Sequence, residues 1–120
     1  MKPRYILAPQ AVRDLVDIWR YIRKESSQQT ADRVESVIRS KFLYLADFPD
    51  GGHWRRDLSA VDVRFFSLYS YLIFYRPTTR PLQIVAILHG HRDVAKALAK
   101  RPDESLPAAK AKEQKRKTQN

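Results

Sequence analysis

The chain has 120 residues, a formal net charge of +10 and no cysteine. This length allows one domain with one hydrophobic core, and the lack of cysteine excludes disulfide bonds and thiolate metal sites. No segment approaches the roughly 20 apolar residues of a membrane-spanning helix, and the start MKPRYILAP has too short an apolar stretch for a signal peptide. We therefore expect a cytoplasmic protein with no membrane partner.

The first half of the chain predicts one strand and two helices. Arg4–Ala8 is a strand candidate, and Pro9 suits the first turn of the helix behind it. Apolar residues recur there at steps of three and four, namely Val12, Leu15, Ile18, Trp19 and Ile22. A second stripe comprises Ala31, Val34, Ile38, Phe42 and Leu45. Ser26 with Gln29 predicts a capping box for the second helix, and so short a link predicts an antiparallel helical hairpin.

The second half predicts strands. Three β-branched and aromatic runs follow one another with short links, at Val63–Phe66, Tyr71–Tyr75 and Leu82–Leu88. The third run is apolar on both alternating faces, which is typical of a central strand covered on both sides. A short helix over Asp93–Lys100 closes the domain.

The predicted order is therefore β-α-α-β-β-β-α. It indicates an α+β fold, with a small, mostly antiparallel sheet and the helical hairpin packed on one of its faces. The other face either stays open for a partner or is capped by the terminal helix. We place the domain at residues 1–100 and a basic, disordered tail at residues 101–120, because the tail has almost nothing to bury.

The positive charge is not confined to that tail. Residues 101–120 contain six basic and three acidic residues, so most of the net charge belongs to residues 1–100. A basic domain favours polyanions or an acidic partner, whereas a purely solubilising role is the alternative. An acidic, amphipathic segment that folds on binding would suit the hairpin.

Polar residues gather where the last strand ends. His89, Gly90, His91, Arg92 and Asp93 follow its apolar run directly, and Gly90 lets the chain turn there. Two imidazoles and a guanidinium at one rim are a candidate polar site. A surface role for the histidines and an Arg92–Asp93 ion pair that fixes the turn are the alternatives.

A second candidate site is the polar loop Asp50–Asp57. It contains His53, Trp54, Arg55 and Arg56, and an exposed aromatic beside guanidinium groups is typical of a contact anchor. Trp19, Phe42, Leu45 and Phe48 are expected in the core. We expect no metal site, because the three histidines have no cysteine or suitably spaced carboxylate beside them.

Five strings taken together carry a family resemblance: YILAPQAVRDLVDIWRYI, FLYLADFPDGG, RRDL, YLIFYR and IVAILHGHRD. In this order and spacing they resemble the RelE/ParE superfamily of toxins of type II toxin–antitoxin systems, closest to the ParE branch, over residues 4–100. The resemblance implies a small cytoplasmic toxin without a cofactor. It also implies a hetero-oligomer with a ParD-like antitoxin, whose extended segment wraps the toxin, and contact with operator DNA only through that complex.

The superfamily contains two mechanisms. RelE-like members are ribosome-dependent mRNA endoribonucleases, and Arg92 matches one of their catalytic arginines, but Ser67 and Leu98 stand where RelE-like enzymes have an arginine and a tyrosine. This loss favours a ParE-like inhibitor that has no catalytic site and that binds and poisons DNA gyrase. Its contact residues would then be Trp54, Arg55, Arg56, His89, His91 and Arg92.

Two alternatives to the gyrase inhibitor stay open. One is an endoribonuclease that uses His89, His91 and Arg92. The other is a degenerate module that binds only its antitoxin and DNA.

Overall fold

The computed structural model describes residues 3–54, 63–90 and 96–97. Its elements are β1 (Tyr5–Leu7), α1 (Pro9–Glu25), α2 (Gln28–Asp47), the 3-10 turn η1 (Pro49–Gly51), β2 (His53–Trp54), β3 (Arg64–Leu68), β4 (Tyr71–Arg76) and β5 (Leu82–His89). The predicted order is confirmed as far as β5, with β2 as an additional strand. Of the predicted closing helix, only Lys96 and Ala97 are described, and both are helical. The predicted tail lies outside the described residues.

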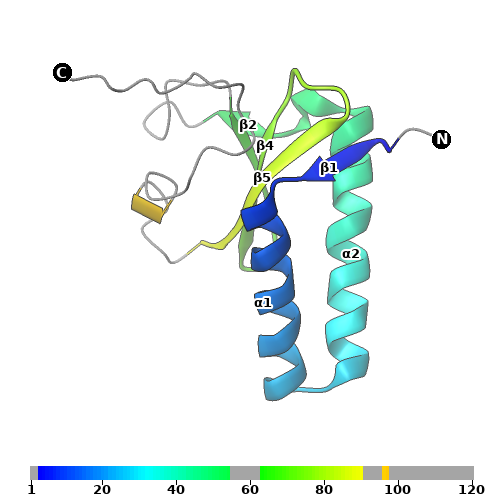
Figure 1. The fold of residues 1–120 in the computed structure, drawn as a ribbon, viewed down its shortest axis with the longest axis vertical. Coiled ribbons are helices and arrows are strands. Elements are labelled where there is room, and N and C mark those ends of the chain that lie inside the picture. The colour runs from blue at the N-terminus through cyan, green and yellow to red at the C-terminus, as the bar shows by residue number, and fades with distance from the viewer. Residues whose placement is uncertain (1–2, 55–62, 91–95, 98–120) are drawn as a thin grey trace.

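The two helices form the expected antiparallel hairpin (Figure 1). The helix link differs from the prediction by one residue, because Ser27 caps α2 and its hydroxyl accepts a hydrogen bond from the Thr30 N–H at 3.0 Å. The predicted capping box at Ser26 is therefore wrong. Thr30, three residues after Ser27, supplies the backbone donor that a cap needs.

The apolar stripe of α2 is confirmed, since Ala31, Ile38, Phe42 and Leu45 are buried. In α1 the buried side includes Ala11, Leu15 and Ile18, whereas Val12 is 48% exposed. Val12 therefore belongs to the predicted apolar stripe but lies at the edge of the buried side. Phe48 is also exposed rather than in the core, because α2 ends at Asp47 and Phe48 lies beyond its last turn. No helix in the described ranges is long and apolar enough to cross a membrane.

The sheet has the order β1-β5-β4-β3-β2. Strand β1 runs parallel to β5, and the other neighbours are antiparallel. As expected, β5 is a central strand, with β1 on one side and β4 on the other (Figure 1). The helical hairpin packs on one face of the sheet, and the main core lies between them.

A β-bulge lets β5 serve both faces of the sheet. Tyr75 pairs with Ile84 and Phe74 pairs with Ala86, so Val85 is an extra residue on β5. As a result Ile84 and Ile87 both pack in the core beneath the hairpin, whereas Ala86 packs on the opposite face.

The face away from the hairpin is not open. Phe74, Ala86 and Leu88 are buried on it, and Ala97 packs against them. The alternative of an open face that awaits a partner is therefore wrong for this part of the sheet. Capping by the segment after β5, the other alternative, fits the position of Ala97.

Candidate functional site

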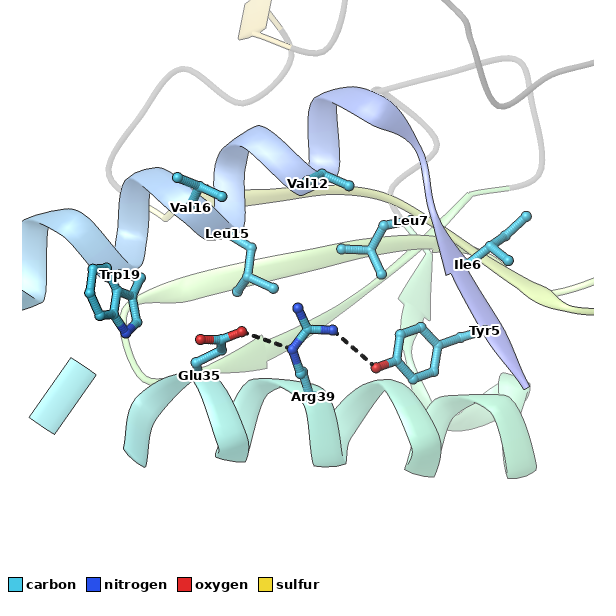
Figure 2. A pocket seen from close by; sticks show the side chains of 9 residues that line it. All are labelled: Tyr5, Ile6, Leu7, Val12, Leu15, Val16, Trp19, Glu35 and Arg39. Atoms are coloured by element: carbon cyan, nitrogen blue, oxygen red, sulfur yellow. Dashed lines mark hydrogen bonds and ion pairs between the residues drawn. The ribbon is translucent and has the colours of Figure 1, made fainter. Parts of the chain in front are cut away.

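A hollow of about 570 Å³ lies between β1, α1 and α2. We call it the hairpin groove, and it is lined by Tyr5, Ile6, Leu7, Val12, Leu15, Val16, Trp19, Glu35 and Arg39 (Figure 2). Most of these side chains are apolar, and Ile6, Val12 and Val16 are each at least 40% exposed. Contiguous exposed apolar side chains of this kind mark an interaction surface.

One polar cluster stands on the α2 side of the groove. Arg39 Nε donates to Glu35 Oε2 at 2.9 Å, and Arg39 Nη1 donates to the Tyr5 hydroxyl at 3.3 Å (Figure 2). The hydrogen bond to Tyr5, followed by that to Glu35, raises the pKa of Arg39 despite its partial burial. Because Glu35 and Arg39 carry opposite charges, the lining of the groove has no net charge.

The groove lies next to a sheet edge. Strand β1 is the first in the sheet order and pairs only with β5, so in the described part of the chain no strand covers its other edge. A free edge beside an apolar hollow suits an extended or helical partner segment. The sequence showed the amphipathic helix but not this groove, because the exposure of Val12 and Val16 depends on how α1 sits on the sheet.

Asp14 holds β5 where β1 ends. The pairing of β1 with β5 stops at Leu7 and Ile84, and beyond it the Asp14 carboxylate accepts a hydrogen bond from the Ile87 N–H at 2.9 Å. Asp14 is the one charged residue classed as buried in the part of the chain described. Sequence reasoning missed this role, although an acidic residue between Ala11 and Ile18 on the buried side of α1 was a usable sign.

The predicted rim at the end of β5 is described only at His89. His89 on β5 pairs with Tyr71 on β4, and the two rings meet edge to face with centroids 5.6 Å apart. Both line a hollow of about 500 Å³ with Asp14, Asp17 and Tyr21 of α1. Burial, with a smaller contribution from Tyr21, raises the pKa of Tyr71. His91 and Arg92 lie outside the described residues.

Trp54 lies on a strand rather than in the predicted loop. It pairs with Arg64 across β2 and β3, and the Arg64 guanidinium carbon is 4.3 Å from the centroid of the Trp54 ring. The predicted exposure of Trp54 is confirmed at 48%. Its guanidinium partner is Arg64, whereas Arg55 and Arg56 lie outside the described residues. A two-residue strand has no periodic pattern from which it could have been predicted.

A buried tyrosine fixes the turn that leads into β2. The Tyr75 hydroxyl donates to the Pro49 carbonyl at 2.6 Å and accepts from the Gly52 N–H at 2.8 Å. A Cβ on Gly52 would lie 2.4 Å from that hydroxyl and 2.7 Å from the Phe65 carbonyl oxygen, so only glycine fits. Burial raises the pKa of Tyr75.

The two predicted sets of contact residues are far apart. Trp54 aligns across the sheet with Ile84, through Arg64 and Tyr75, whereas His89 aligns with Tyr71. Three strand spacings and about four residue steps separate Trp54 from His89, which is roughly 20 Å. The structure therefore gives two surfaces rather than one site.

The described residues offer little acid–base or metal chemistry. His53, on β2, packs near Phe65, with 5.6 Å between their ring centroids, and lies three strands away from His89 on β5. No group of three or more His, Asp or Glu in the described ranges is placed to hold a metal ion. Ser67 is exposed on β3, and Leu98 lies outside the described residues.

Comparison with known proteins agrees with this architecture. The family described as "ParE toxin of type II toxin-antitoxin system, parDE" matches residues 5–94. A solved structure described as the chromosomal ParDE TA system from P. aeruginosa matches with a TM-score of 0.60 and 20% identity, over 71% of this chain and 92% of that chain. At this identity the structural likeness shows a shared fold alone. A search of curated proteins finds no match. Because the family match spans most of the chain, from β1 to beyond β5, this protein belongs to the ParE toxin family of type II toxin–antitoxin systems.

Proposed function

We propose that this protein is a growth-inhibiting toxin that binds and poisons DNA gyrase, and that a ParD-like antitoxin neutralises it in a hetero-oligomer. The observation that carries the antitoxin half is the hairpin groove beside the free edge of β1. The gyrase half is supported by membership of the ParE family. It is also supported by Ser67, which stands where RelE-like ribonucleases have an arginine.

The hairpin groove has the features of a site for a segment that folds on binding. Its exposed aliphatic side chains supply burial, and the free backbone groups of β1 supply hydrogen bonds for an added strand. The net charge of +10 favours the approach of an acidic segment. Because the groove itself carries no net charge, we expect charge to govern the association rate and apolar contact to govern the dissociation rate.

The substitution Val12→Asp tests the antitoxin half. It places a carboxylate in the groove on a half-exposed side chain, so the free toxin should fold normally. Burial of that charge against an apolar partner should weaken binding by about 30-fold or more, as measured by calorimetry with the cognate antitoxin. Gln29→Asp is the matched control, because it adds the same charge at an exposed position outside the groove. Equal affinity for both variants would remove the groove from the interface.

Two parallel assays on the free toxin test the gyrase half. The first measures supercoiling and trapped cleavage complexes with purified gyrase, and the second maps messenger RNA ends on translating ribosomes. We expect trapped, cut DNA and intact messages. New message ends with unaffected gyrase would instead support the endoribonuclease, and their loss in the His91→Ala, Arg92→Ala double variant would assign the chemistry to the rim. Unchanged growth on induction would support the degenerate module.

The proposed contacts to gyrase remain Trp54, Arg55, Arg56, His89, His91 and Arg92. The separation of roughly 20 Å between Trp54 and His89 still fits beneath one interface of standard size, which covers about 800 Å² on each partner. If both surfaces meet the same target, Trp54→Ala and His89→Ala should each weaken poisoning, and the double variant should weaken it further. A lack of effect of either substitution would exclude that surface.

A further inference from the structure

Three exposed aromatic side chains gather where α2 ends. Tyr44, Phe48 and Trp54 are 41%, 59% and 48% exposed, and together with Lys41 and Arg64 we call them the aromatic patch. Figure 1 shows that α2 ends at the same end of the molecule as β2. The ring centroids of Tyr44 and Phe48 are 5.2 Å apart.

The η1 turn joins the two halves of the patch. On one side, a Cβ on Gly51 would lie 3.2 Å from the Tyr44 ring. On the other side, Arg64 Nη1 donates to the carbonyl oxygens of Asp50 at 3.0 Å and Gly52 at 3.3 Å, while its guanidinium stacks on Trp54. The turn is itself held by the buried Tyr75 hydroxyl. The exposed rings therefore lie beside a turn that hydrogen bonds hold in one conformation.

Cations lie over the rings of the patch. Lys41 Nζ is 5.7 Å from the centroid of Tyr44 and 5.9 Å from that of Phe66, and Arg64 lies over Trp54. Two carboxylates lie nearby: Asp47 pairs with Arg4, and Asp50, which is 91% exposed, pairs with Arg64, whose side chain is 15% exposed. Lys41 therefore supplies the accessible positive charge beside the exposed rings.

The hairpin groove and the hollow at His89 differ from the aromatic patch in charge. The hairpin groove contains one acid and one base, Glu35 and Arg39. The hollow at His89 contains two acids, Asp14 and Asp17, and no lysine or arginine in its lining. Even with Asp50 counted against Arg64, Lys41 leaves the aromatic patch with a positive charge beside three exposed rings, whereas the groove has no net charge and the hollow at His89 is acidic. The patch therefore matches a ligand that has negative charge and flat apolar faces.

We propose that the aromatic patch binds single-stranded DNA. Bases stack on Trp54 and on the Tyr44–Phe48 pair, and a phosphate contacts Lys41. A duplex would not use the rings, because its bases are already stacked on one another. The inference rests on the proposed function for its setting, because unpaired bases become accessible only where DNA is cut or opened, and it names the surface that would meet them.

The first experiment uses Trp54 as its own reporter. The chain has two tryptophans, so the full chain with Trp19→Phe reports on Trp54 alone. Titration with an oligothymidylate of about 12 nucleotides, within the site size of such proteins, should quench this fluorescence. Lys41→Gln should reduce the slope of log affinity against log salt by about 0.7, as expected for one lost phosphate contact. Absence of quenching at saturating oligonucleotide would overturn the proposal.

A matched pair of variants separates the patch from the basic tail. In fluorescence anisotropy with a labelled oligothymidylate, Trp54→Ala should bind about fivefold more weakly or worse, as expected for one lost stacked base. Tyr21→Ala removes an aromatic ring that is 61% exposed outside the patch, and its affinity should equal that of the wild type. Both variants keep the tail, so equal affinity for Trp54→Ala and wild type would overturn the proposal.

The gyrase assay distinguishes this inference from the proposed function. If the wild type binds the oligonucleotide through Trp54 but does not trap gyrase, the proposed target is wrong and the site stands. If Trp54→Ala retains oligonucleotide binding but loses gyrase poisoning, the patch is a protein contact and the inference is wrong.

Discussion

The two edges of the sheet are built in different ways. At the β1 edge, α1 and α2 leave an aliphatic hollow without net charge. Beyond the end of β1, the Asp14 carboxylate accepts the hydrogen bond from β5 that a longer β1 would accept. At the β2 edge, exposed rings and cations stand on a turn that one hydroxyl and one glycine hold in place. Because the supports share no residue, we expect that each edge can be altered without the other. The fold thus presents two surfaces suited to chemically different partners.

Removal of the Asp14 carboxylate should have the largest effect on stability. Asp14→Ala leaves the Ile87 N–H without its acceptor and should reduce the free energy of unfolding by about 2–3 kcal/mol, as measured by urea denaturation. Asp14→Asn keeps an acceptor oxygen and should recover the larger part of this loss. Equal stability of the two variants would contradict the role given to this hydrogen bond. In the native state of either variant, Trp54 fluorescence should not change.

A methyl group at Gly52 should displace β2 at the other edge of the sheet. Gly52→Ala forces its Cβ against the Tyr75 hydroxyl and the Phe65 carbonyl and should cost about 1–3 kcal/mol. Trp54 fluorescence should shift as β2 is displaced, while antitoxin affinity at the hairpin groove stays unchanged. Gly51→Ala is the control, because the atoms nearest to its Cβ belong to the side chain of the exposed Tyr44, at 3.2 Å or more. A loss of antitoxin affinity in Gly52→Ala would show that the edges are coupled.

Loss of the Tyr75 hydroxyl should have the smallest of these effects. Tyr75→Phe removes two hydrogen bonds to the turn but leaves the ring in the core, at a cost of about 1 kcal/mol near neutral pH. Since the pKa of Tyr75 is raised above its ordinary value of 10.0, the unfolded chain loses this proton at a lower pH than the folded protein does. The contribution of the Tyr75 hydroxyl to stability is therefore complete below the unfolded pKa of about 10. It is lost as the pH rises through the higher pKa of the folded protein.

The difference in stability between wild type and Tyr75→Phe should accordingly shrink as the medium becomes more alkaline. Urea denaturation of both proteins across this range measures it. A difference that is constant or grows with pH would mean that the hydroxyl is not held in its neutral form by the fold.

Local pattern accounts for what the sequence predicted correctly. The α2 stripe from Ala31 to Leu45 and the apolar run of β5 depend on neighbours a few residues away, so periodicity reveals them. The hydrogen bond from Ile87 to Asp14 joins residues 73 positions apart, and the Tyr75 hydroxyl reaches back 26 positions to Pro49. Nothing near either residue in the chain encodes such contacts. They decide how the two edges are held.

For the candidate contact residues too, local pattern predicted position and exposure, whereas the contacts depend on distant parts of the chain. The exposure of Trp54 followed from its polar neighbours, whereas its stacking on Arg64 required the pairing of β2 with β3. His89 was correctly placed at the end of a central strand, but its neighbours on α1 depend on the packing of the hairpin. The roles of Arg55, Arg56, His91 and Arg92 stay predictions.

The extra residue in β5 also determines which deletions the strand tolerates. Val85 interrupts the alternation, and His89 shares the hairpin side with Ile84 only because of it. Deletion of Val85 or Ala86 would restore a regular ladder and leave every later side chain on its present face. Deletion of one residue elsewhere in β5 would invert part of the strand and exchange residues between the two cores. Homologues that lack one residue in this strand are therefore expected to have lost it at position 85 or 86.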